Sequence, residues 1–94
     1  ALLERLNAEL LAEDLEKHSI LIALTADGRV VFGGREIGLN GLRGVVARQL
    51  REKEAPVIIL ADGDARTSPL VDVIDECKLA GARQVSIAAE REGH

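Results

Sequence analysis

The sequence has almost no aromatic side chains. Phe32 is the only one, and the chain contains no Trp, Tyr or Met. Proteins that bind single-stranded nucleic acid stack bases on aromatic rings, so this class of binding surface is excluded. A formal net charge of −4 also argues against sequence-independent binding to nucleic acid. Such binding needs clustered Lys and Arg to displace counterions.

Cysteine and long apolar runs are equally scarce. The single cysteine, Cys77, cannot form an internal disulfide, and its place on an apolar helix face favours a buried side chain over a nucleophile. No run approaches the roughly 18 apolar residues of a membrane span, and no signal peptide is recognisable. Because the chain begins at Ala1 rather than Met, we expect a fragment of a longer protein, with residues 92–94 as a tag remnant.

The second half of the chain predicts a β-α-β unit. Residues 57–60 are apolar on both faces, which is typical of an interior strand. Ser68 as N-cap and Pro69 as the first helical residue predict a helix start, and Gly81 predicts its end. Alternation over residues 85–89 then predicts a second strand, parallel to the first.

Residues 2–17 predict an amphipathic helix with a broad leucine stripe among acidic residues. The leucines of the stripe recur at spacings of three, four and seven: Leu2, Leu3, Leu6, Leu10, Leu11 and Leu15. An acidic polar face disfavours a membrane surface, so we expect this helix to pack on the domain or against a second copy. His18 follows where a cation suits a helix C-terminus, and we do not expect it to be a ligand.

A hairpin follows this helix. Residues 19–25 and 29–32 are predicted strands, and Asp27-Gly28 between them is a strong hairpin signal. Gly33-Gly34 is expected to be a turn, because the third glycine and the lysine of a phosphate loop are missing.

The next predicted helix begins with Gly38 or Asn40 as its N-cap and runs to about Lys53. Together these elements predict an α+β fold of the two-layer α/β type: a mixed sheet of about four to five strands, two helices packed on one face, and the N-terminal amphipathic helix. The other face carries apolar residues of 20–24 and 57–60. Either the N-terminal helix or a second copy of the protein is needed to cover it.

Five segments carry a resemblance to a known family. They are the hairpin TADGRVVFGGREI, the leucine-rich helix after it, the strand PVIILADGDA, the helix LVDVIDECKLAG and the strand VSIAA. In this order and spacing they resemble the periplasmic domain of the ExbD/TolR biopolymer-transport proteins, over about Ser19 to Ala89. The resemblance divides the chain into a linker helix over residues 1–18 and an ExbD/TolR-like domain over residues 19–91.

The resemblance implies an accessory subunit of a proton-motive-force-driven inner-membrane motor, of the ExbB-ExbD-TonB or TolQ-TolR-TolA type. Its implied partners are an ExbB/TolQ-like motor subunit, a TonB/TolA-like transducer, a second copy and, in TolR, peptidoglycan. It also implies a single inner-membrane helix, with a proton-handling aspartate, outside this sequence, and a periplasmic place for the present domain. Two departures from the family are Thr67, where a tyrosine is usual, and a leucine-rich helix instead of a flexible linker.

The alternative is a small α/β regulatory or metal-binding domain that uses Asp62 and Asp64. Both follow a predicted parallel strand, where α/β sheets place ligands and where carboxylates can hold Mg²⁺. However, an Asp-Gly-Asp sequence is more often only a turn, and the chain lacks a partner base, a nucleophile or a phosphate loop. We therefore predict no enzymatic activity, no cofactor and no tight metal site.

Self-association is the remaining prediction, most simply as a two-fold homodimer. The last predicted strand can lie at a sheet edge, where its backbone groups could add a second copy or an extended peptide. The predicted interface residues are Leu6, Leu10, Val85, Ile87 and Ala89. The sequence leaves open whether the leucines contact a second copy or fold back onto their own sheet.

Overall fold

The computed structural model describes residues 18–90. Within this range the chain forms five strands and two helices: β1 (Ile20–Leu24), β2 (Val30–Phe32), β3 (Arg35–Glu36), α2 (Gly38–Glu52), β4 (Val57–Asp62), α3 (Thr67–Leu79) and β5 (Val85–Glu90). The helix predicted over residues 2–17 and the expected tag remnant at residues 92–94 lie outside the described residues.

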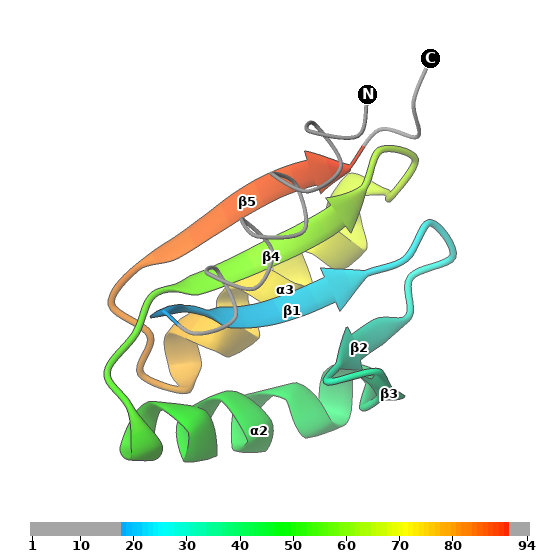
Figure 1. Ribbon diagram of the computed structural model, residues 1–94. Helices are drawn as coiled ribbons and strands as arrows, with labels where there is room; N and C mark the ends of the chain where they lie inside the picture. Colours follow the sequence, from blue (N-terminus) through cyan, green and yellow to red (C-terminus); the bar gives the residue numbers. More distant parts are fainter. Residues whose placement is uncertain (1–17, 91–94) are drawn as a thin grey trace, which may run out of the picture.

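One mixed sheet organises the domain. Its strand order is β3-β2-β1-β4-β5, with β1 antiparallel to β2 and parallel to β4, and β4 parallel to β5. Both helices lie on the same face of this sheet (Figure 1). The predicted α+β fold and the predicted β-α-β unit are therefore confirmed.

The turn residues explain the antiparallel end of the sheet. Thr25 N–H donates to the Arg29 carbonyl at 2.9 Å and Gly28 N–H to the Thr25 carbonyl at 3.1 Å, which makes a three-residue hairpin loop. Gly28 has a φ of +85°, a conformation that a side chain would strain. The Gly33-Gly34 turn leads to β3, a two-residue strand that the sequence pattern did not predict.

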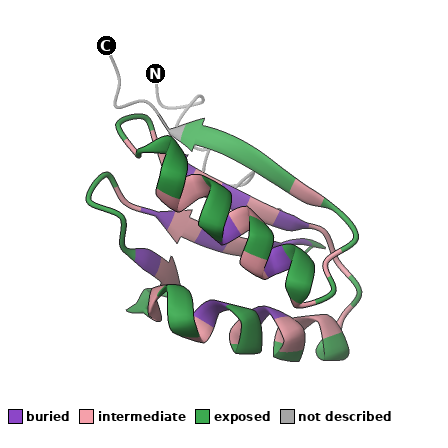
Figure 2. Ribbon diagram, turned by 180° about the vertical axis from the view of Figure 1, so that it is seen from behind, coloured by how far each residue is buried: buried purple, intermediate pink, exposed green. Residues whose placement is uncertain are grey.

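The core lies between the sheet and the two helices. Alternate residues of β1 and β4 point into it, and Ile22 and Ile59 are 0% exposed. Leu42 of α2 and Cys77 of α3 are equally buried, as predicted for the cysteine. Figure 2 shows these buried stretches on the inner sides of the helices and strands. Each large apolar side chain buried here stabilises the fold by about 1.5–3 kcal/mol.

The helix starts differ from the predictions. α3 begins at Thr67, so the prediction of Ser68 as N-cap is wrong: Arg66 takes that position, with extended backbone and no side-chain cap hydrogen bond. Pro69 then falls in the first turn, where a missing N–H costs no intrahelical bond. In α2, Ile37 is the N-cap, so neither Gly38 nor Asn40 has the predicted role.

The helix ends agree with the predictions. α2 ends at Glu52, with Lys53 as its C-cap. After α3, Gly81 has a φ of +108°, and its N–H donates to the Lys78 carbonyl at 3.0 Å while Ala82 N–H donates to the Cys77 carbonyl at 3.2 Å. This pair of bonds is the Schellman motif, which turns the chain from α3 toward β5.

Candidate functional site

β5 forms one edge of the sheet and pairs only with β4 in the described chain. Val57 N–H donates to the Gln84 carbonyl at 2.9 Å. In a parallel ladder the backbone groups of successive residues point alternately to the two sides. The N–H and C=O groups of Val85, Ile87 and Ala89 therefore point away from β4, toward the open edge. These are the three residues of β5 that the sequence predicted as interface residues.

Their side chains lie on the helix-covered face of the sheet. Ile87 is in register with Ile59 of β4, and Val85 with Val57. Even so, Ile87 is 48% exposed, whereas Ile59 is fully buried. Figure 2 shows β5 as exposed over most of its length. The other two predicted interface residues, Leu6 and Leu10, lie outside the described residues.

A second exposed apolar side chain lies on the solvent side of α3. Val71 is 46% exposed. Glu76 marks the flank of α3 that faces α2, because its Oε2 lies 2.8 Å from Nη2 of Arg43. At 100° per residue, Val71 lies about 140° from the mean direction of the buried Val73 and Cys77, so it points away from the sheet. Within residues 18–90, the edge of β5 therefore combines backbone groups that have no strand partner with one half-exposed apolar side chain, Ile87.

The acidic turn after β4 has a structural role. The carboxylate of Asp62 accepts a hydrogen bond from the Asp64 N–H at 2.9 Å, and the Asp62 carbonyl accepts one from the Ala65 N–H at 2.9 Å. This is an Asx turn, in which the side chain copies a backbone turn. Within residues 18–90, no group of three or more His, Cys, Asp or Glu side chains is placed to hold a metal ion.

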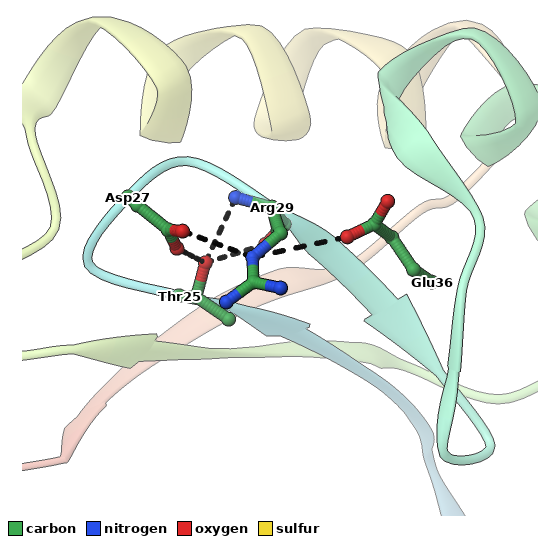
Figure 3. A network of polar contacts seen from close by, with 4 residues as sticks. All are labelled: Thr25, Asp27, Arg29 and Glu36. Atoms are coloured by element: carbon green, nitrogen blue, oxygen red, sulfur yellow. Dashed lines mark hydrogen bonds and ion pairs between the residues drawn. The ribbon is translucent and has the colours of Figure 1, made fainter.

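The hairpin carries the densest polar network of the described surface (Figure 3). The Thr25 hydroxyl donates to the Asp27 carboxylate and accepts from the Arg29 N–H at 2.8 Å. Nε of Arg29 lies 3.0 Å from Oδ2 of Asp27 and 3.8 Å from Oε1 of Glu36. The hydroxyl and the guanidinium lower the pKa of Asp27. The contact of Arg29 with Glu36 ties the turn to β3.

A shallow hollow of about 620 Å³ lies at the opposite end of the sheet, where α2 ends, β4 begins and the chain enters β5. Arg51, Lys53 and Arg83 line it, and Nη1 of Arg83 lies 3.3 Å from Oε1 of Glu54. Both partners of this pair are largely exposed, so it contributes little to stability. No signal in the sequence pointed to this hollow.

Comparison with known proteins identifies the family of the chain. A search of curated proteins gave no match. Among residues 18–90, no helix has the length and apolar character of a membrane span. The family model described as Biopolymer transport protein ExbD/TolR matches residues 6–92, which is nearly the whole chain and contains every described strand and helix. The chain therefore belongs to the ExbD/TolR family of biopolymer transport proteins.

Proposed function

We propose that the chain is the periplasmic domain of an accessory subunit in a proton-motive-force-driven inner-membrane motor of the ExbB-ExbD-TonB or TolQ-TolR-TolA type. Family membership supports the coarse role, an accessory protein of biopolymer transport. In this role the domain couples proton flow to outer-membrane transport or envelope integrity. It does so through contacts with proteins and, for a TolR-like subunit, with peptidoglycan. A membrane helix outside this sequence anchors it beside an ExbB/TolQ-like motor subunit.

The observation that carries the contact role is the open edge of β5. Its outward N–H and C=O groups can pair with one more strand, which satisfies donors and acceptors that water otherwise solvates. Ile87 supplies apolar surface beside that strand. An extended segment of a TonB/TolA-like transducer fits this edge, because strand addition takes its affinity from the main chain and its specificity from alternate side chains.

A second copy fits the same edge. Two identical β5 edges related by a two-fold axis run antiparallel, so each copy offers the other the same residues: Val85, Ile87 and Ala89. Pairing through this edge extends the two sheets into one. We propose that the homodimer forms in this way and that transducer binding competes with it or follows its opening.

The domain's role involves no chemistry of its own. Asp62 is engaged in its turn, and Cys77 is buried, with its thiol pKa raised to about 11 by that burial and by the charge of Glu76. Calorimetric titration with Mg²⁺ and Ca²⁺ tests this part of the proposal. We expect no stoichiometric binding, and a metal held at Asp62 and Asp64 with micromolar affinity would refute it.

The motor role is tested in the bacterium that carries the gene. The gene is deleted and then restored in its full-length form, either unchanged, as Ala89→Pro or as Ala89→Val. Proline removes the outward N–H of Ala89, whereas valine keeps it. For an ExbD-like subunit, we expect only Ala89→Pro to abolish protonophore-sensitive uptake through the outer membrane. For a TolR-like subunit, we expect only Ala89→Pro to abolish detergent resistance. If deletion changes neither property, the motor role is wrong.

A further inference from the structure

The sheet has a second face that neither α2 nor α3 covers. We call this the open face. Because side chains alternate along strands, the register of β1, β2, β4 and β5 assigns its apolar residues: Leu21, Ala23, Val31, Ile58, Leu60 and Ala88. The first five are partly exposed and Ala88 is exposed.

The apolar part of the open face is continuous across the middle of the sheet. Ala23 pairs with both Val31 and Leu60, and Leu60 pairs with Ala88, so these residues lie side by side on four adjacent strands. Polar residues stand at its margins, with Glu36 on β3 and Ser86 at the start of β5. An apolar centre with a polar rim is typical of a surface that is covered by another element.

We propose that residues 2–17 of the same chain form the helix that covers the open face, running back across the sheet antiparallel to β1. The connection between this segment and β1 allows the segment few orientations. His18 is helical, and a single residue, Ser19, separates it from β1 at the centre of the sheet. Ser19 is 6% exposed, and its carbonyl accepts a hydrogen bond from Nζ of Lys53 at 3.3 Å. The end of the segment is thus fixed at the border of the open face.

The dimensions of the two parts agree. A helix over residues 2–17 is about 24 Å long. The six residues of β4 extend over about 20 Å, so the helix spans the sheet from one end of the strands to the other. Leu3, Leu6 and Leu10 recur at i, i+3 and i+7, which is the spacing of one helix face. The opposite sheet face is unavailable to these leucines because α2 and α3 fill it.

A helix from a second copy is a weaker competitor for the open face. A one-residue connection holds the chain's own segment at an effective concentration in the millimolar range, without a loss of translational entropy. The open edge of β5 remains available for partners in this arrangement, since strand pairing uses the edge rather than the face of the sheet.

The experiment uses a reporter cysteine on the open face of the full chain. Ala23→Cys places a thiol at its centre, and Ala26→Cys places one on the exposed hairpin as the accessible reference. Reactivity with a thiol reagent is measured in each chain. The native Cys77 is 0% exposed and reports unfolding in the same experiment. Leu6→Asp with Leu10→Asp then removes two leucines, and Ala8→Asp with Ala12→Asp adds the same charge without removing any.

We expect the Ala23→Cys thiol to react at least about tenfold more slowly than the Ala26→Cys thiol, as local closure requires. The leucine substitutions remove this protection while Cys77 stays unreactive, and the alanine substitutions leave it intact. Protection is independent of protein concentration over two orders of magnitude. Protection that disappears on dilution assigns the face to a second copy and overturns the proposal. Equal reactivity of the two reporters, or protection that survives the leucine substitutions, overturns it as well.

Discussion

Ile59 and Ile87 are neighbours in register on β4 and β5, and both point to the helix-covered face of the sheet. The first is fully buried, whereas the second is 48% exposed. Two residues of the same type, one strand apart, thus have different surroundings. The cause is the width of the helix layer, because α2 and α3 pack over the central strands and leave much of β5 uncovered (Figure 2).

The different exposure of the two isoleucines separates a residue that stabilises the fold from one that remains exposed. Ile59 contributes to the free energy of folding, because water never reaches it in the native state. Ile87 keeps about half of its surface for a partner, next to backbone groups that also lack one within the described chain. We therefore propose that a single sheet supplies a core on its central strands and a docking edge on its last strand.

Truncation of the two isoleucines gives the largest expected effect. Ile59→Ala should lower the free energy of unfolding by about 3–4 kcal/mol, because it removes transfer energy and leaves a cavity. Ile87→Ala should cost less than about 1 kcal/mol in the monomer, since its side chain is already half in water. Urea denaturation of both variants at low protein concentration measures the difference. Equal losses would remove the distinction between core and edge.

The pH dependence of stability gives a second contrast between the buried core and the exposed edge. Burial, and secondly the charge of Glu76, raises the pKa of Cys77 from an ordinary 9.0 to about 11. The unfolded thiol ionises first as pH rises, so unfolding is favoured progressively between pH 9 and pH 11. The expected loss over this window is about 2–3 kcal/mol.

Two variants isolate this thiol. Cys77→Ala removes the titrating group, and its unfolding free energy should lack the alkaline loss. Adding Ile87→Cys to it returns a thiol at the exposed edge, where we expect an ordinary pKa and no comparable loss. An identical alkaline loss in wild type and Cys77→Ala would show that other groups cause it.

The smallest effect concerns the turn that leads the chain into β5. Gly81→Ala should cost about 1 kcal/mol, because a φ of +108° is strained for a residue with a side chain. An added Cβ would meet no atom within 4 Å there, so strain alone is measured. Gly44→Ala in α2 also meets nothing within 4 Å, but its helical position should make it stabilising by up to about 1 kcal/mol. In thermal melts, we expect Gly81→Ala to lower the midpoint of unfolding and Gly44→Ala to raise it.

Local chemistry made most of the fold predictable. Asp27-Gly28 marked the hairpin, Gly81 marked the end of α3, and apolar runs marked β1 and β4. β3 was not predicted because its two residues form a strand only by pairing with Val31 and Phe32. The start of α3 was predicted two residues too late, because Ser68-Pro69 also suits a helix start.

The candidate site was less accessible to sequence reasoning. Alternation identified Val85, Ile87 and Ala89 as strand residues, but it could not establish that β5 lies at the edge, since strand order depends on where each crossover returns. The exposure of Ile87 was not predictable either, because only packing shows how far the helix layer extends over the sheet.

The central claim is that the edge of β5 is a pairing surface, and sedimentation equilibrium of three full chains tests it most directly. Wild type and Ala89→Val keep every outward N–H and should form dimers. Ala89→Pro should be monomeric with an unchanged fold, because it removes an N–H that does not pair with β4 and because proline suits an edge strand. A wild type that stays monomeric at hundreds of micromolar, or an Ala89→Pro chain that dimerises as tightly as wild type, would contradict the account.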